Sequence, residues 1–474
     1  MTSSKNHADA TGASSFASKP ADLPRQVKAE WWARRQRLDD RLCVLLGAME
    51  DQWLCGLRGL IQSHNTPAND DNLLGFKKTL EWIMSQAVNT MSSAPSSVLG
   101  GRASASSKRQ SFIQIEINID LCRTILHLGD QPTFQELKDL IYFLVDAYLY
   151  KNTTSACASP SATSGAGSDV ETASSMIDYT VVQFGRIAMQ IKEALRCYWV
   201  AETEAKNNGF DDGAHVILIL DKHLQVFPWE SCPVLRGEAV SRVPSLWFLR
   251  DRIMKQRYLI SSGEWKDLEV NPKRAFYVLN PGGDLKNTED EFREYVESQE
   301  GWDGIVGRAP LEMECINGLL KNDLYVYFGH SGGEQYIKST QIRQLGHCAV
   351  SLLLGCSSGS LKGGGEFDPT GNAMNYLLAG CPTLVANLWD VTDKDLDRFS
   401  MATFNLWGLQ ENRCDRSNNR ETKKTSSGLR LSLVEAVKEA REECKLKFLV
   451  GAASVVYGIP CFLKRGNSSD SQKP

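Results

Sequence analysis

The chain has 474 residues, of which 42% are hydrophobic and 23% are charged, and its formal net charge is −4. At roughly 150 residues per domain, this length predicts two or three domains of an ordinary globular protein. A net charge so close to zero gives no general attraction to nucleic acid or to an anionic membrane. No apolar run reaches the ~18 residues that a transmembrane helix needs, so none is expected.

The 13 cysteines favour a reduced, intracellular protein. Their number is odd, they form no C-x-x-C pairs, and no apolar signal segment opens the chain. None of the seven histidines stands at ligand spacing from a cysteine pair, so we expect neither a metal site nor another cofactor. The adjacent His347 and Cys348 are assigned to a loop that enters a strand.

Residues 24–214 show mainly helical patterns, after a Ser/Ala/Thr-rich tail at 1–23 that is expected to be disordered. The expected helices lie at about 24–63, 72–91, 114–127, 133–150 and 179–205. Two Ser/Ala/Gly-rich stretches without periodicity, 92–109 and 153–175, indicate flexible insertions. A helical amino-terminal region is therefore predicted.

Short apolar runs alternate with helical segments in the second half. The runs are 216–220, 275–279, 324–328, 350–354 and 383–388. Helix-competent segments between them lie at 290–298, 312–320, 370–379 and 393–406. This alternation predicts an α/β fold with a mostly parallel sheet flanked by helices.

The expected boundaries in this half follow from the same pattern. Residues 215–270 are predicted to form a connecting segment with the first strand, and 271–465 the sheet domain. A polar insertion is expected at 410–428, a last long helix at 432–448 and a disordered tail at 466–474.

Two motifs place a reactive side chain directly after a strand: Tyr327-Phe-Gly-His-Ser-Gly-Gly333 and Leu352-Leu-Leu-Gly-Cys-Ser-Ser-Gly359. Each opens with an apolar run and breaks at glycine immediately before His330 or Cys356. Parallel strands that end this way leave an imidazole and a thiol side by side at their carboxyl ends. The pattern predicts Cys356 as a nucleophile and His330 as its acid and base.

Backbone groups next to these side chains have an expected role as well. Glycines around both motifs permit tight turns and close approach of a substrate backbone. The N–H of Cys356 and one just after His330, that of Ser331 or Gly332, are expected to bind a developing oxyanion. Alone, a buried cysteine is usually core filling and a Gly-His pair is usually a turn; their combination on one sheet favours chemistry.

The two motifs resemble those of the caspase-like cysteine peptidases, and the longer text is similar to the separases. Further similarity spans roughly residues 215–465, whereas the part before residue 200 carries little. The segments that carry it are Phe227–Arg236 with Ser241–Ser245, Val278–Leu285, Ala379–Arg398 and Leu446–Pro460. Relatives usually have glycine directly after the catalytic histidine, where this chain has Ser331.

The resemblance implies a caspase-like fold with a helical substrate-binding region before it. It also implies an endopeptidase that cuts after arginine in a Glu-x-x-Arg context. The expected substrate is the kleisin subunit of cohesin, cut to release sister chromatids at anaphase, and the expected inhibitor is securin. Location in cytoplasm and nucleus follows, with no requirement for nucleic acid or membrane. Full-length separases carry a large helical-repeat region upstream of such a part.

An arginine at the cut needs a buried or partly buried carboxylate, because its guanidinium stays charged. The acidic loop after the last of the apolar runs supplies four candidates: Asp390, Asp393, Asp395 and Asp397. Asp393 and Asp397 are four residues apart and would share a helix face. We expect Asp397 to bind the arginine, with Asp393 next; an acid in a first helical turn often only stabilises the helix dipole, which fits Asp393 best.

Two other functions stay open. One is a caspase-like peptidase with a different scissile residue, which a basic pocket would mark if it cut after aspartate. The other is a catalytically inactive scaffold, which the intact His330 and Cys356 disfavour. Trp229 and Trp389 are expected to be core aromatics. Pro228-Trp-Glu and Arg242-Val-Pro are expected to form the seam between the helical region and the sheet.

Overall fold

A computed structural model describes most of the chain. The described residues are 25–61, 70–92, 114–156, 184–206, 215–259, 268–409 and 430–464. Both predicted tails, the polar stretch 410–428 and nearly all of the two predicted insertions lie outside this set. Thr153 to Ala156, expected to start the second insertion, instead end a helix.

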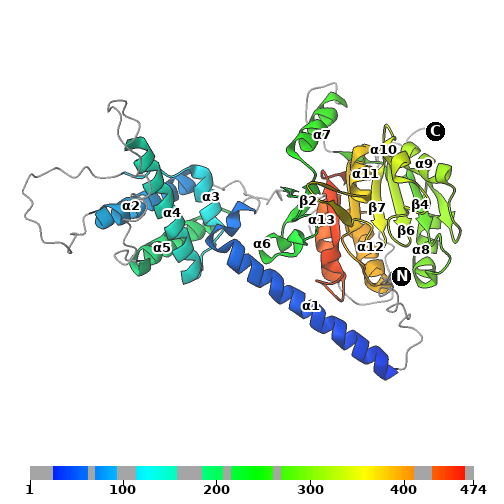
Figure 1. Ribbon diagram of the computed structural model, residues 1–474, viewed down its shortest axis with the longest axis horizontal. Helices are drawn as coiled ribbons and strands as arrows, with labels where there is room; N and C mark the ends of the chain where they lie inside the picture. The colour runs from blue at the N-terminus through cyan, green and yellow to red at the C-terminus, as the bar shows by residue number, and fades with distance from the viewer. Residues whose placement is uncertain are drawn as a thin grey trace, which may run out of the picture.

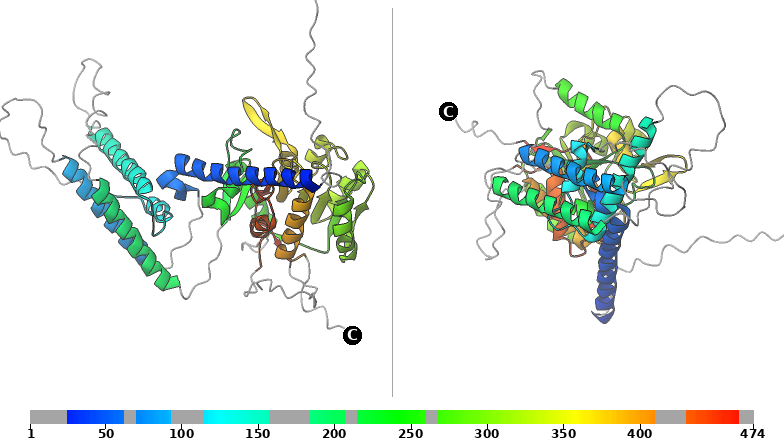
Figure 2. Two further views of the ribbon diagram at one scale, coloured as in Figure 1. Left: turned by 90° about the horizontal axis from the view of Figure 1, so that it is seen from below. Right: turned by 90° about the vertical axis from the view of Figure 1, so that its left-hand side faces the viewer.

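A helical unit and a sheet unit lie side by side (Figures 1 and 2). The long helix α1 (Arg25–Trp53) runs along the sheet unit and ends at the helical unit, where the short 3-10 helix η2 (Cys55–Leu60) follows. Two buried carboxylates fix α1 to the sheet unit. Asp39 accepts from the amides of Phe448 and Leu449 at 2.8 and 2.7 Å, and Glu50 accepts from the Val234 amide at 2.8 Å. These acids satisfy buried backbone donors that would otherwise lack partners.

Four helices share one apolar core in the helical unit: α2 (Asp70–Ser92), α3 (Ile119–Leu126), α4 (Phe134–Ala156) and α5 (Phe184–Lys206). Helix α3 begins later than residue 114, where the sequence placed it. The preceding chain is extended and bonds to α2, because the Ile115 amide donates to Ser85 Oγ at 2.9 Å. The Ile117 amide likewise donates to Glu81 Oε1 at 2.9 Å. Because these side chains of α2 bind the amides of Ile115 and Ile117, helix α3 starts only at Ile119.

The sheet unit contains a sheet with eight strands among the described residues. In spatial order they are β1 (His215–Ile219), β2 (Ala239–Val243), β11 (Ser454–Gly458), β10 (Thr383–Asn387), β7 (Val350–Leu354), β6 (Leu324–Phe328), β4 (Ala275–Leu279) and β5 (Trp302–Val306). All neighbouring strands are parallel except for one pair, β10 and β11, which are antiparallel to each other. The prediction of a mostly parallel sheet is confirmed, and β4, β6 and β7 have the predicted bounds.

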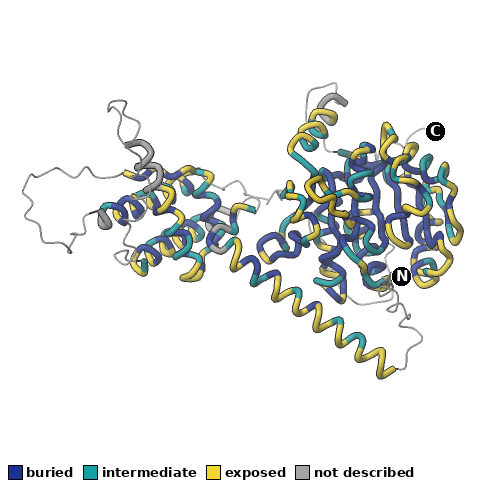
Figure 3. Tube along the Cα trace, in the orientation of Figure 1, coloured by how far each residue is buried: buried dark blue, intermediate teal, exposed yellow. Residues whose placement is uncertain are grey.

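Helices cover both faces of this sheet, which Figure 3 shows as a buried layer. One face carries α8 (Lys286–Ser298), α12 (Asp393–Trp407) and α13 (Leu433–Ala440); the other carries α9 (Glu312–Lys321), α10 (Ser339–Arg343) and α11 (Asn372–Leu378). Within β4, Tyr277 and Leu279 face the first layer and Phe276 and Val278 the second. Because both faces are covered, such strands are apolar throughout, which made them visible in the sequence.

The stretch 215–270, expected to connect the two units, contributes β1 and β2 to the sheet edge. Strand β2 was not predicted because it contains Arg242. That side chain is 1% exposed and pairs with the equally buried Glu230, with Nε 2.7 Å from Oε1. Paired and hydrogen-bonded charges can be buried where single charges cannot. The helices α6 (Pro233–Arg236) and α7 (Leu246–Leu259) flank β2.

The two tryptophans are core aromatics, as predicted. Trp229 is buried against Leu46 and Met49 of α1, and its Nε1 donates to the Leu224 carbonyl at 3.0 Å. Trp389 is partly buried and its Nε1 donates to the Leu449 carbonyl at 2.8 Å. The first of these packs the seam where the helical region meets the sheet.

The prediction of one long helix at 432–448 is wrong. Helix α13 ends at Ala440 and a short 3-10 turn follows it. The buried Asp395 carboxylate accepts from the amides of Lys445 and Leu446 at 3.1 and 3.0 Å. The Arg441 guanidinium donates to the Ser454 carbonyl at 3.0 Å. These tertiary hydrogen bonds replace those of a continued helix.

Several short strands also escaped prediction. They are β5, β11, the hairpin β8 (Leu361–Gly364) with β9 (Phe367–Gly371), and the pair β3 (Glu269–Val270) with β12 (Phe462–Leu463). The helix expected at 370–379 therefore starts only at Asn372, after β9. Within the ranges that the structure describes, no helix combines the length and apolarity needed to span a bilayer.

Candidate active site

The carboxyl ends of β6 and β7 bring His330 and Cys356 to one edge of the sheet. The two strands are parallel neighbours, with Phe328 opposite Leu354. His330 follows Phe328 by two residues, and Cys356 follows Leu354 by two residues. The two residues therefore stand at the same level beyond the ends of the two strands. The sequence pattern had predicted this placement from strand ends alone.

Gly355 lets the two loops touch. A Cβ at this position would lie 2.1 Å from the Ser331 carbonyl oxygen and 2.4 Å from that of Gly329. Both distances are far inside van der Waals contact, so any side chain would push the loops apart. A glycine immediately before Cys356 is therefore required for the close approach of the two motifs.

The Cys356 thiol is partly buried and donates to the Val391 carbonyl at 3.2 Å. Burial raises the pKa of this thiol, the Val391 contact lowers it, and the nearby Asp390 and Asp393 carboxylates raise it further, for a net rise. Among the described residues no hydrogen bond joins the thiol to His330. The thiol is thus protonated at neutral pH, and a base would be needed to form its thiolate.

His330 has a carboxylate partner that the sequence reasoning did not select. Its Nε2 lies 2.8 Å from Oδ2 of Asp284, and the two side chains are 55% and 46% exposed. Asp284 follows β4, the strand beside β6. It stood in the segment Val278–Leu285, where its place after a strand was a usable signal. The contact engages Nε2 of the imidazole and not Nδ1.

Side chains that precede and follow it in the sequence hydrogen-bond to the loop after His330. Tyr327 Oη donates to the His330 carbonyl at 2.9 Å, and Asn372 Nδ2 donates to the Gly332 carbonyl at 3.1 Å. The Gly332 amide donates to the Glu334 carboxylate at 2.9 Å. Of the two predicted oxyanion donors after His330, Gly332 is therefore already occupied, and the amide of Ser331 is the better candidate.

Ser331 adopts a left-handed backbone conformation, with φ of 51°. This conformation costs a residue with a Cβ about 1–2 kcal/mol relative to glycine. Ser331→Gly is therefore expected to raise the free energy of unfolding by about 0.5–1 kcal/mol, after the extra chain entropy of glycine is subtracted. Its amide stays in place, so peptide turnover should persist.

Denaturant titration and peptide assays of Ser331→Gly check this, with Ser331→Ala as the control that keeps a Cβ. A glycine variant less stable than the wild type would contradict the strain at this position.

The four acids of the predicted loop differ in their surroundings. Asp395 is fully buried and caps backbone amides, so it has a structural role. Asp390 accepts from Ser357 Oγ at 2.6 Å, and Ser357 directly follows Cys356. Asp393 is exposed in the first turn of α12. Asp397 alone combines burial with the lack of a salt bridge among the described residues; the nearby Arg398, which pairs with Asp395, lowers its pKa.

Asp397 is 5% exposed, and Thr288 Oγ1 lies 3.1 Å from both of its carboxylate oxygens. Burial raises its pKa to about 7, although the Thr288 hydroxyl lowers it; the Glu291 and Asp393 carboxylates contribute to the rise. The Asp397 carboxyl is therefore partly protonated and partly ionised near neutral pH. A guanidinium placed beside it would favour the charged form.

Asp397 should make folding stability depend on pH. Its folded pKa of about 7 exceeds the ~3.9 of an unfolded aspartate, so its stabilising contribution is full below pH ~4 and is lost as pH rises to about 7. Asp397→Asn keeps the shape and removes the titration. At pH 8 this variant should be more stable than the wild type, by at most about 4 kcal/mol. Thermal melts at pH 4.5 and 8 check this; an equal difference at both values would contradict it.

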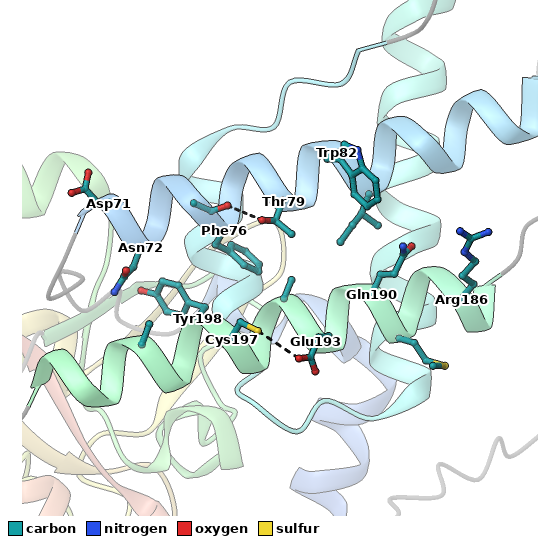
Figure 4. Close-up of a pocket in the computed structure, with 15 residues that line it drawn as sticks. Asp71, Asn72, Phe76, Thr79, Trp82, Arg186, Gln190, Glu193, Cys197 and Tyr198 are labelled. Carbon is teal, nitrogen blue, oxygen red and sulfur yellow. Dashed lines mark hydrogen bonds between the residues drawn. The ribbon is translucent and has the colours of Figure 1, made fainter.

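A separate groove of about 920 Å³ lies in the helical unit, between α2 and α5 (Figure 4). Phe76, Trp82, Met189 and Tyr198 are among its lining residues. The groove is mainly apolar and contains no candidate of the strand-end site. It therefore takes no part in the chemistry of that site.

A mostly parallel, helix-flanked sheet with an imidazole and a thiol at adjacent strand ends defines a caspase-like peptidase domain. Comparison with known families agrees, because the family described as "Separin, protease domain" matches residues 13–396. The separin of Emericella nidulans is 37% identical over 440 residues, which cover 92% of this chain and 19% of that protein. The chain thus belongs to the separin protease-domain family.

Another relative and a solved structure match a similar share of this chain. The separin of Schizosaccharomyces pombe is 36% identical over 93% of this chain and 21% of its own length. A solved Saccharomyces cerevisiae separase–securin complex superposes with a TM-score of 0.72 at 28% identity, over 93% of this chain and 26% of that one. The chain therefore spans about a fifth of the length of the curated relatives it matches.

Proposed function

We propose that this chain is a cysteine endopeptidase in which Cys356 is the nucleophile and His330 transfers protons. The observation that carries the proposal is the matched register of the two side chains beyond β6 and β7, with their loops in contact at Gly355. Family membership supports peptidase activity in general. The residue roles rest on the geometry.

The reaction follows from the positions of these groups. Nδ1 of His330 accepts the thiol proton as Cys356 Sγ attacks the scissile carbonyl carbon. The amides of Cys356 and Ser331 stabilise the oxyanion. His330 then protonates the leaving amine, which leaves an acyl-enzyme that water hydrolyses with His330 again as base.

We further propose cleavage after arginine in Glu-x-x-Arg sites, with Asp397 binding the guanidinium. The physiological substrate in this proposal is the kleisin subunit of cohesin, whose cleavage triggers sister-chromatid separation at anaphase in the cytoplasm and nucleus. Family membership supports this assignment, and so does the burial of Asp397 without a salt bridge among the described residues. Securin is the proposed inhibitor, because the similar yeast separase was solved in complex with it.

A panel of fluorogenic peptides tests the specificity. Peptides of the form Glu-x-x-Arg should be cleaved, and the same peptides with lysine or aspartate at the cut should be cleaved at least about tenfold more slowly. Preference for aspartate would favour a different caspase-like peptidase. No turnover of any peptide by the folded chain, together with an unreactive Cys356, would favour an inactive scaffold.

A further inference from the structure

Three adjacent strands deliver three polar side chains in a row at one edge of the sheet. In the order β7, β6, β4 these are Cys356, His330 and Asp284. The Asp284 carboxylate lies on the far side of His330 from the nucleophile's strand, with Oδ2 2.8 Å from Nε2. The imidazole thus has one nitrogen bonded to a carboxylate and the other free for chemistry.

The loop that carries Asp284 is built around Asn280, which is 1% exposed and has φ of 50°. Its amide donates to the Phe328 carbonyl at 2.9 Å, at the end of the strand that carries His330. Its side chain accepts from the Leu285 amide at 2.9 Å and donates to Glu289 at 2.6 Å. A left-handed residue held by its own side chain indicates a loop of fixed shape. Asp284 is therefore placed by backbone that is tied to β6.

We propose that Asp284 is the positioning residue for His330, which makes the site a Cys356–His330–Asp284 triad. This inference rests on the proposed function. The carboxylate accepts the Nε2–H, so the neutral imidazole presents its lone pair at Nδ1. When the thiol proton moves to Nδ1, the Nε2 proton stays in place and the carboxylate stabilises the imidazolium. The Nδ1 proton then passes to the leaving amine, and the original tautomer is restored.

A role in stability alone is the competing explanation. Both side chains are about half exposed, and ion pairs of that kind contribute little to stability. The hydrogen bonds of Asn280 also hold the loop without Asp284. Loss of this carboxylate should therefore change kinetics and leave folding intact.

The test compares Asp284→Asn, Asp284→Ala and Asp284→Glu with the wild-type chain on a Glu-x-x-Arg peptide. For the first two, kcat should fall roughly 10- to 100-fold while KM changes less than about twofold. Asp284→Glu should recover part of kcat. Asp290→Asn, an exposed aspartate six residues on, is the control and should behave as wild type.

The possible outcomes distinguish a failure of the triad from a failure of the proposed function. A wild-type chain that cleaves no peptide refutes the proposed function, whatever Asp284 does. A cleaving wild type with Asp284→Asn unchanged in kcat overturns the triad alone. A loss of kcat that follows a lower melting temperature, with no recovery in Asp284→Glu, would show a structural role and overturn it as well.

Discussion

Cys356→Ser is expected to abolish peptide cleavage, lowering kcat/KM by roughly 10⁴-fold or more. The hydroxyl of serine is a far weaker acid than the thiol, and its alkoxide is correspondingly harder to form with an imidazole base. His330→Ala should have an effect of similar size, because the raised pKa of Cys356 leaves little thiolate without a base. Steady-state assays on an arginine peptide give both values.

Folding should survive both changes. Cys356 is only partly buried and His330 is exposed, so the melting temperature is expected to move by a few degrees at most. The exposed Cys43 and His347 offer matched controls: Cys43→Ser and His347→Ala should cleave at wild-type rates. Retained turnover in Cys356→Ser or His330→Ala would end this assignment of the nucleophile and base.

Asp397→Ala is expected to lower kcat/KM for arginine substrates by roughly 30-fold or more. Removal of a buried carboxylate that pairs with a guanidinium costs about 2–5 kcal/mol in binding, and each 1.36 kcal/mol is tenfold in rate. Alkylation of Cys356 by a small reagent should barely change, since Asp397 is absent from the groups that act on the thiol. The two measurements together separate a lost pocket from a damaged nucleophile.

Asp393→Ala is the matched control on the same helix. Asp393 is exposed and its carboxylate raises the pKa of Cys356, so this variant should keep its arginine specificity and alkylate slightly faster. A defect in Asp393→Ala with normal Asp397→Ala would mean that the pocket exists and the wrong acid was named. Normal kinetics in both would show that another loop binds the arginine.

The pKa of Asp397 adds a signed prediction for substrate affinity. With a value of about 7, the carboxyl is mostly protonated below pH 7 and must release its proton to pair with a guanidinium. The Kd of a reversible arginine peptide should therefore rise as pH falls below about 7, by up to tenfold per pH unit. In Asp397→Asn this dependence should vanish.

The sequence predicted the parts of the site that stand on buried parallel strands. Strands such as β6 and β7 are apolar on both faces, so their ends are visible in the sequence, and a reactive residue after each end is placed with them. No contact with a distant segment is needed to infer that His330 and Cys356 share an edge.

The sequence pattern could not predict features that depend on contacts between distant segments of the chain. Strand β2 depends on the pairing of Arg242 with Glu230, and the early end of α13 depends on the Asp395 carboxylate. Asp284 was missed although its place after a strand was a signal, because only the order of strands in space shows that it lies beside His330. The burial of Asp397 was expected, whereas its partner Thr288 lies 109 residues away in sequence and could not be inferred.

Covalent labelling with an arginine acyloxymethyl ketone peptide tests the central proposal most directly. This reagent combines the expected specificity group with an electrophile that only an activated thiol attacks at low concentration. If Cys356 and Asp397 act as proposed, mass spectrometry will find one adduct, on Cys356, and Asp397→Ala will label at least about tenfold more slowly. Labelling spread over the exposed Cys43 and Cys197, or equal labelling by an aspartate analogue, would contradict an arginine-specific cysteine peptidase at this strand edge.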